Sequence, residues 1–223
     1  MQRLSIPETI PMQTDEAIRA RKTVKILSDR DLPASDHCCQ INEILTLAGQ
    51  APFHRVCEEH HRQASSQSGI EPWRFHALDA ASCRKLRTQI PRENAGKVPA
   101  MLAAADALIM TTWLPNSSDA PYVGDEPGFA ATVNNMEHIA AASAAIQNLL
   151  LAATARGVLS YWSSGGVLRS TEVFKLLGIP RLQILLGAVF LFPKEYGEAE
   201  LATSKLREHR GSRETWSRWV TLH

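Results

Sequence analysis

Residues 136–156 read MEHIAAASAAIQNLLLAATAR, and the chain continues through Gly157 into VLSYWSSGG at 158–166. Apolar side chains recur at helical spacing from Ile139 to Ala153, and Gly157 is the kind of residue that typically ends a helix. The alanines among them are small on nearly every face, so a second helix can approach closely on one side while a sheet packs on the other. The stretch therefore predicts a long helix, 136–156, buried between a sheet and a partner.

Short apolar runs elsewhere in the chain predict the strands of that sheet. They lie at 73–78, 106–112, 158–163 and 184–192. Helices are predicted at 15–21, 80–89, 97–105 and 170–177, and Ser35 or Asp36 can cap one more that ends near Gly49. A chain of 223 residues with 44% hydrophobic content is sufficient for one well-buried domain, 1–223.

The overall composition excludes several classes of function. Lys and Arg total 24 against 23 Asp and Glu, so no bulk positive field exists to hold nucleic acid or an anionic membrane. The beginning of the chain lacks the apolar run of a signal peptide, and no stretch resembles a membrane span, which favours a cytoplasmic protein. The four cysteines include no C-x-x-C and are expected to be free thiols.

Three segments carry little periodic signal. Residues 50–69 are polar and read as a long loop or insertion, and 114–129, with three prolines, reads as a loop that could cover a site. The charged tail from 198 to 223 contains Trp216 and Trp219, which indicates that it packs against something, such as another subunit.

A basic run at 19–25 is the first candidate site. Guanidinium, ammonium and hydroxyl donors occur together there, as a phosphate dianion requires, in Arg21, Lys22, Thr23 and Lys25. A solvated surface face explains the same composition equally well. A second basic group, with Arg207 and Arg210, is distant in sequence and would reach the first only through folding.

The glycine-rich turn at 163–166 is the second candidate site. It follows an apolar strand, and a strand end that opens into glycines lets backbone N–H groups approach a planar ring such as a flavin. An ordinary strand-to-helix turn is the alternative reading.

A third feature is the H-x-x-C-x-x-H-H series of His54, Cys57, His60 and His61. It could hold a transition metal or haem on an otherwise structural dimer, although its spacing matches no standard zinc pattern. No G-x-G-x-x-G, Walker A or G-x-S-x-G motif is present.

Several motifs in order along the chain resemble the nitroreductase family. Residues 21–25 (RKTVK) resemble its phosphate motif, 51–54 (APFH) an Ala-Pro-x-His variant, and 71–75 (EPWRF) its Gln-Pro-Trp-x-Phe strand entry. The helix at 148–157 resembles the family's dimer helix, 161–165 (YWSSG) the Trp-x-Ser/Thr-Gly turn of a compact branch, and 210–219 its C-terminal segment.

The resemblance implies an α+β fold, with a mixed sheet flanked by helices, in an intertwined homodimer whose 198–223 tail packs on the partner. It also implies flavin mononucleotide (FMN), which takes hydride from NADPH or NADH and passes it to a small acceptor such as a nitroaromatic or quinone by a ping-pong mechanism, with no catalytic side chain. The expected FMN-binding residues are Arg21, Lys22, Thr23, Lys25, His54 from the partner, Trp162, Ser163, Ser164, Gly165, Arg207 and Arg210.

The chain departs from the family pattern near the strand entry. Gly69 and Glu71 stand where Asn and Gln are common, so a side-chain amide contact to the flavin is missing, and 55–68 resembles an insertion. These departures motivate an alternative function, in which the protein binds flavin or another ligand without turnover.

Overall fold

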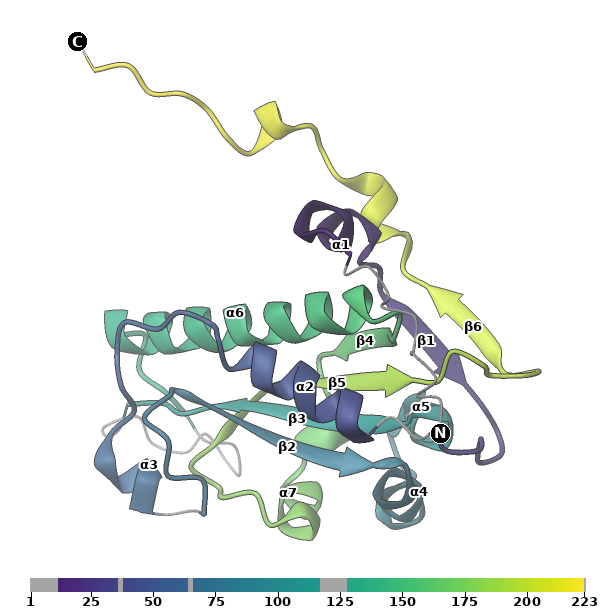
Figure 1. The fold of residues 1–223 in the computed structure, drawn as a ribbon. Helices are drawn as coiled ribbons and strands as arrows, with labels where there is room; N and C mark the ends of the chain where they lie inside the picture. Colours follow the sequence, from purple (N-terminus) through teal and green to yellow (C-terminus); the bar gives the residue numbers. More distant parts are fainter. Residues whose placement is uncertain (1–11, 36–37, 64–65, 117–127, 223) are drawn as a thin grey trace, which may run out of the picture.

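The computed structural model describes all residues except 1–11, 36–37, 64–65, 117–127 and 223. Its helices and strands follow one another in an α+β arrangement (Figure 1). In chain order they are α1 Thr14–Ala20, β1 Val24–Leu27, α2 Cys38–Ala48, α3 Glu59–Gln63, β2 Trp73–Asp79, α4 Ala80–Gln89, α5 Val98–Ala104, β3 Ala107–Trp113, α6 Val133–Ala155, β4 Leu159–Ser163, α7 Thr171–Leu177, β5 Ile184–Phe192 and β6 Glu200–Thr203. Short 3-10 helices cover Gly166–Arg169, Lys205–His209 and Arg213–Thr215.

The main sheet has the strand order β2-β3-β5-β4, and its neighbouring strands are antiparallel. The centre of this sheet is buried: every residue of β3 and most residues of β5 are buried. The register slips between Thr111 and Thr112, opposite Gly187 of β5. This irregularity lies at the end of the sheet where β4 runs into the 163–166 turn.

Helices cover both faces of this sheet (Figure 1). On one face, α6 and α2 pack on β3 and β5 around Ile146, Leu149 and Val189. On the other face, α4, α5 and α7 enclose a second cluster that contains Leu102, Phe174 and Phe190. The α+β fold class expected from the sequence is confirmed, although the described strands pair only in antiparallel fashion, where the resemblance implied a mixed sheet.

The long helix forms where the sequence predicts it and begins three residues earlier. The Thr132 hydroxyl accepts a hydrogen bond from the Asn135 amide at 3.2 Å, and Gly157 after the helix has a φ of 68°. Ala141, Ala142 and Ala145 face the sheet, whereas Val133 and Met136 are more than half exposed on the outer side. By length and composition this helix could cross a membrane, contrary to the sequence-based expectation, but its buried face packs on the sheet as in a core helix.

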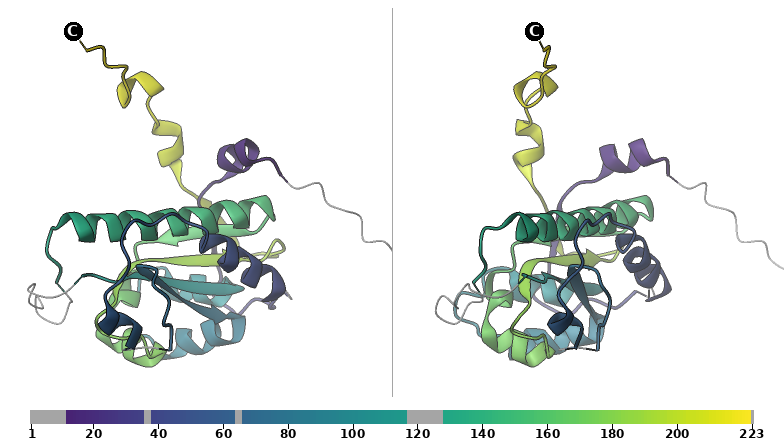
Figure 2. Two further views of the ribbon diagram at one scale, coloured as in Figure 1. Left: turned by 60° about the vertical axis from the view of Figure 1, so that its left-hand side comes forward. Right: turned by 90° about the vertical axis from the view of Figure 1, so that its left-hand side faces the viewer.

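A separate two-stranded sheet pairs β1 with β6, from Val24 opposite Thr203 to Leu27 opposite Glu200. This pairing was not predicted, and it joins the beginning of the described chain to its end. The tail after β6 then leaves the body of the molecule in every view (Figure 2). Trp216 and Trp219 in this tail are 73% and 91% exposed.

Residues 50–69 are not a featureless loop, which corrects the sequence-based expectation. They contain α3, in which the Gln63 amide donates to the Glu59 carboxylate at 3.0 Å. His61 on this helix is buried, and its Nε2 lies 2.7 Å from the Pro115 carbonyl oxygen. A short helix and a part-buried hydrogen bond therefore give structure to a segment whose polar composition suggested a loop. Most of the predicted 114–129 loop lies outside the described residues.

Candidate functional site

The basic run begins at the C-terminal end of α1 and continues into β1. Arg21 ends the helix, where its own amide donates to the Ala17 carbonyl at 2.9 Å. Its side chain is partly buried, while that of Lys22 is exposed. Thr23 accepts a 3.4 Å hydrogen bond from the Ser204 amide, which ties the run to the chain beyond β6.

The C-terminal arginines reach this run because β6 pairs with β1. The Arg207 guanidinium donates to the Arg21 carbonyl at 3.0 Å and also to the Arg19 carbonyl. Arg207 is therefore used to hold the backbone at the end of α1. Arg210 lies close enough to repel the charge of Arg21. The structure thus brings Arg21 together with Arg207 and Arg210, which lie more than 180 residues later in the sequence.

The electrostatics of this arginine cluster favour an anion. Burial, followed by repulsion from Arg210 and Arg207, lowers the pKa of Arg21. The charged groups that shift this pKa are both cations, so bringing the side chains together costs free energy until a negative charge neutralises them. A phosphate dianion fits this donor set because guanidinium forks hold its oxygens in pairs.

Lys25 connects the basic run to the second candidate site. Its Nζ lies 4.5 Å from the ring centroid of Tyr161 on β4, a cation–π contact. Only one residue, Trp162, separates Tyr161 from Ser163, where β4 ends. The contact therefore places the basic run beside the strand that leads into the glycine-rich turn.

The turn after β4 is tightly constrained. Ser163 is buried, and its Oγ accepts a 3.2 Å hydrogen bond from the Gly165 amide. Gly165 has a φ of 110°, which favours glycine, and a Cβ there would lie 2.7 Å from Cδ2 of Leu185. Ser164 is exposed, whereas Ser163 and Gly165 are buried.

Trp162, immediately before the turn, lies across Gly187 of β5. A Cβ at Gly187 would meet the indole Nε1 of Trp162 at 2.0 Å, so only glycine allows this approach. Trp162 is 37% exposed.

His54 lies far from the arginine cluster within the chain. Its segment packs through Phe53, whose ring meets Trp73 edge-on at 5.6 Å, near the N-terminal half of α6. In contrast, α1 and the arginine cluster lie towards the C-terminal half of α6 (Figure 1). The exposed His54 therefore does not join the cluster of its own chain.

Arg74 on β2 is a buried cation that the sequence analysis did not single out. Its side chain is among the most buried polar groups, and it donates to the carbonyls of Gln67, Gly69 and Glu71 at 2.7–3.0 Å and to its neighbour Trp73. An arginine inside an aromatic strand was the available signal, because a buried charge must be hydrogen-bonded. Arg74 holds the 67–71 segment in place.

Gly69 and Glu71, the two positions at which the chain departs from the family pattern, pack against each other. A Cβ at Gly69 would meet the Glu71 carboxylate oxygen at 2.2 Å, so the acidic side chain folds back over the glycine. A side chain at 69 and this position of Glu71 are therefore mutually exclusive.

The histidine and cysteine series does not form a metal site among the described residues, where no three such side chains gather. Cys57 is buried and its thiol donates to the Gly69 carbonyl, while His60 and His61 stack on each other with centroids 4.0 Å apart. Burial lowers the pKa of His61. The described thiols, Cys39, Cys57 and Cys83, are free, as expected, and burial raises the pKa of Cys83 to about 12.

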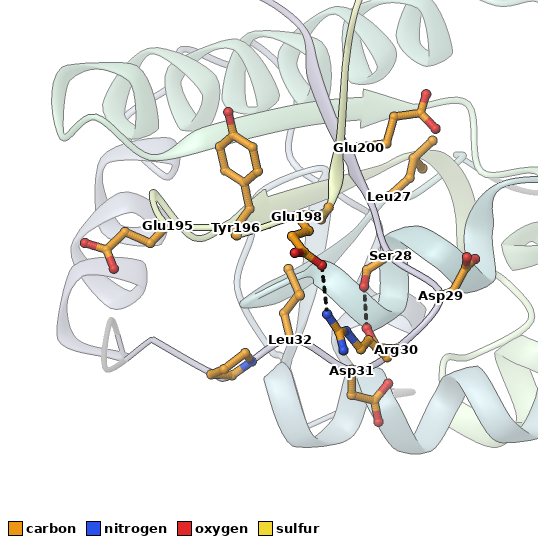
Figure 3. A pocket seen from close by; sticks show the side chains of 13 residues that line it. Leu27, Ser28, Asp29, Arg30, Asp31, Leu32, Glu195, Tyr196, Glu198 and Glu200 are labelled. Atoms are coloured by element: carbon orange, nitrogen blue, oxygen red, sulfur yellow. Dashed lines mark hydrogen bonds and ion pairs between the residues drawn. The ribbon is translucent and has the colours of Figure 1, made fainter.

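A cavity of about 760 Å³ lies beside the β1–β6 pair (Figure 3). Its charged walls are mostly acidic, and the Arg30 guanidinium there is paired with Glu198 at 3.4 Å. The acidic lining residues are Asp29, Asp31, Glu195, Glu198 and Glu200. Carboxylates of this number repel a phosphate, so this cavity is not the anion site.

Comparison with known proteins agrees with this arrangement. The sequence profile of the Nitroreductase family matches residues 18–191. A protein of Archaeoglobus fulgidus named as an NADH dehydrogenase/NAD(P)H nitroreductase is 27% identical over 205 residues, covering 89% of this chain and 96% of that protein.

Solved structures share the fold at low identity. A nitroreductase-like family protein from Bacillus cereus is 19% identical with a TM-score of 0.57, covering 92% of this chain and 98% of the other. A nitroreductase from Desulfovibrio desulfuricans, solved in complex with FMN, has the same identity and TM-score and covers 96% of this chain and 100% of the other. Since the profile spans most of the sequence, this chain belongs to the nitroreductase family.

Proposed function

We propose that this protein is an FMN-dependent oxidoreductase that takes hydride from NADPH or NADH and passes it to a small acceptor, such as a nitroaromatic or quinone. The observation that carries the proposal is the arginine cluster of Arg21, Arg207 and Arg210, held beside the strand that ends in the 163–165 turn. Two relatives of the same fold were solved with FMN bound, which supports this choice of cofactor.

Different residues hold the phosphate and the ring of FMN. Arg21 and Arg210, with Lys22 and Thr23, bind the phosphate, and Arg207 fixes the backbone beneath them. The turn at Ser163, Ser164 and Gly165 faces the ring, with Trp162 alongside, and Lys25 keeps the two parts in register through Tyr161. When bound, FMN supplies the hydride chemistry in two half-reactions, a ping-pong sequence, and the chain contributes position and charge.

We also propose a homodimer. The outer side of α6 exposes Val133 and Met136, and the tail exposes Trp216 and Trp219, all of which a second copy would cover. Two α6 helices packed antiparallel bring the 51–54 segment of one copy towards the arginine cluster of the other, since these lie at opposite ends of α6 (Figure 1). His54 would then contact the partner's flavin. The free thiols suit a reducing compartment, which we propose is the cytoplasm.

One observation favours the second candidate, a flavin-binding protein without turnover. Glu71 occupies the space above Gly69, so a carboxylate replaces the amide groups that the family commonly has there. Negative charge near a flavin ring opposes its reduction, because the reduced ring is itself anionic.

The decisive experiment is an absorbance spectrum of the protein purified without added cofactor, before and after anaerobic addition of NADPH or NADH. Flavin bands that bleach, and return with a quinone or nitroaromatic, support the enzyme. Bands that persist support the binding protein. A flat spectrum that added FMN cannot restore would refute both.

A further inference from the structure

Arg169, the last residue of the 3-10 helix Gly166–Arg169, contacts the glycine-rich turn and β5 at the same time. Its Nε donates to the Ser164 carbonyl at 2.6 Å, and its Nη1 donates to the Leu185 carbonyl at 2.6 Å. A longer bond of 3.4 Å runs from Nη2 to the Leu186 carbonyl. One guanidinium therefore fastens the exposed turn to a strand of the central sheet.

The contact with Ser164 determines the direction of the next amide. The Ser164 carbonyl and the Gly165 N–H belong to one peptide unit, and in a planar trans peptide these two groups point in opposite directions. Arg169 holds the carbonyl on one side of the turn. The Gly165 N–H must then point to the other side, where it donates to Ser163 Oγ at 3.2 Å.

Without the Arg169 contact, this peptide unit would lose one of the two hydrogen bonds that hold its orientation. Gly165 has a φ of 110°, and glycine accepts either orientation of the preceding peptide at little steric cost. The aliphatic part of Arg169 also covers the glycine, because a Cβ at Gly165 would lie 3.1 Å from Cγ of Arg169. Arg169 is thus the side chain that touches both the carbonyl and the flexible residue.

We propose that Arg169 is a positioning residue that holds the Ser164–Gly165 peptide of the turn and so keeps the Ser164 carbonyl turned away from the ring of the bound cofactor. This inference rests on the proposed function, in which the turn faces FMN. A ring nitrogen that accepts hydride carries a lone pair, which an N–H attracts and a carbonyl oxygen repels. Arg169 binds the Ser164 carbonyl while the Ser163 hydroxyl accepts the Gly165 N–H, so the peptide unit is held in one orientation from both sides.

The first arm of the test uses the cofactor-free protein. Arg169→Met keeps the aliphatic stem and removes the guanidinium, and Arg92→Met removes an exposed arginine between α4 and α5 as a matched control. In ¹⁵N NMR spectra we expect the Gly165 amide to shift and its hydrogen exchange to accelerate roughly tenfold or more in Arg169→Met, as when a modest hydrogen-bond constraint is lost. The amide of Ala188 in β5 should stay unchanged, which shows that the variant is folded.

The second arm measures flavin binding by fluorescence quenching, with FMN and riboflavin compared. Because Arg169 acts on the ring and not on the phosphate, Arg169→Met should weaken both ligands by the same factor, roughly tenfold or more. Arg169→Lys keeps the charge but reaches fewer carbonyls, and it should restore only part of the affinity. The midpoint potential of bound FMN should shift in Arg169→Met and stay constant in Arg92→Met.

The outcomes separate the two proposals. An unchanged Gly165 amide in folded Arg169→Met, or a changed amide with unaltered affinities and potential, would overturn the role of Arg169. Wild-type protein that binds neither flavin would overturn the proposed function instead, while the NMR arm would still decide whether Arg169 holds the turn.

Discussion

Replacing Arg21 with alanine should weaken FMN binding without weakening riboflavin binding. Arg21 is partly buried and lies with Arg207 and Arg210, so its charge is screened less than that of exposed Lys22. A hydrogen bond to a charged group contributes about 1.5–3 kcal/mol, which corresponds to a loss of roughly 10- to 150-fold in FMN affinity. Riboflavin lacks the phosphate, and its affinity should stay within about twofold of the wild type.

In the cofactor-free protein, the same substitution should not reduce stability. Burial and the repulsion from Arg210 and Arg207 lower the pKa of Arg21, so its charge is held there at a cost. Arg21→Ala removes that repulsion, and the melting temperature without FMN should stay constant or rise slightly. This combination of weaker FMN binding with undiminished stability distinguishes a ligand-binding cation from a structural one.

The assay is a titration of apoprotein with FMN and with riboflavin at low and high salt, with Arg92→Ala as control. The wild-type preference for FMN should shrink as salt rises, because ions screen the phosphate contact. Equal losses for FMN and riboflavin in Arg21→Ala would place the residue at the ring, and an unchanged FMN affinity would mean that the phosphate binds elsewhere. Either result would refute the arginine cluster as the phosphate site.

Three further predictions concern packing and pH. Gly187→Ala forces a Cβ into the indole of Trp162, so the melting temperature and flavin affinity should both fall, whereas unchanged near-ultraviolet circular dichroism would contradict the contact. Arg74→Met removes the guanidinium from several part-buried carbonyls, and urea unfolding should show a loss of about 3 kcal/mol; a loss under about 1 kcal/mol would mean that water replaces the guanidinium. Burial lowers the pKa of His61 and of His76 in the folded protein. As the pH falls through the ordinary histidine pKa of about 6.5, the unfolded chain therefore binds more protons than the folded chain, and the free energy of unfolding should decrease from pH 7.5 to 5.5. A stability that is flat or rises on acidification would show that these histidines are protonated in the fold.

The sequence predicts the central elements because their signal is local. The helix α6 repeats its apolar residues at helical spacing, and β5 is a continuous apolar run between turns. The β1–β6 pair has no such signal, since each strand has four residues and the partners lie about 175 residues apart in the chain. Both strands are also too short and too polar at their exposed positions to stand out from loop.

At the site, too, the sequence predicts features that arise from neighbouring residues and misses contacts between distant ones. The turn at Ser163–Gly165 follows from a strand that opens into glycines, but its partner Arg169 was not singled out, because a guanidinium that bonds carbonyls looks like any surface arginine in a sequence. Arg207 and Arg210 were both candidates for a cofactor contact, and the structure adds that Arg207 donates to the backbone of Arg19 and Arg21. Hydrogen bonds to main-chain carbonyls carry no residue-type pattern that could reveal them.

Three segments of the site are held by arginines that bond backbone carbonyls: Arg207 at the end of α1, Arg74 at 67–71, and Arg169 at the turn. At each of these places one guanidinium donates to two or more carbonyls at once. A carboxylate partner would cancel the charge, whereas a carbonyl leaves most of it in place. Arg207 therefore orders the backbone at the end of α1 and adds positive potential beside Arg21, which is the combination that phosphate binding needs.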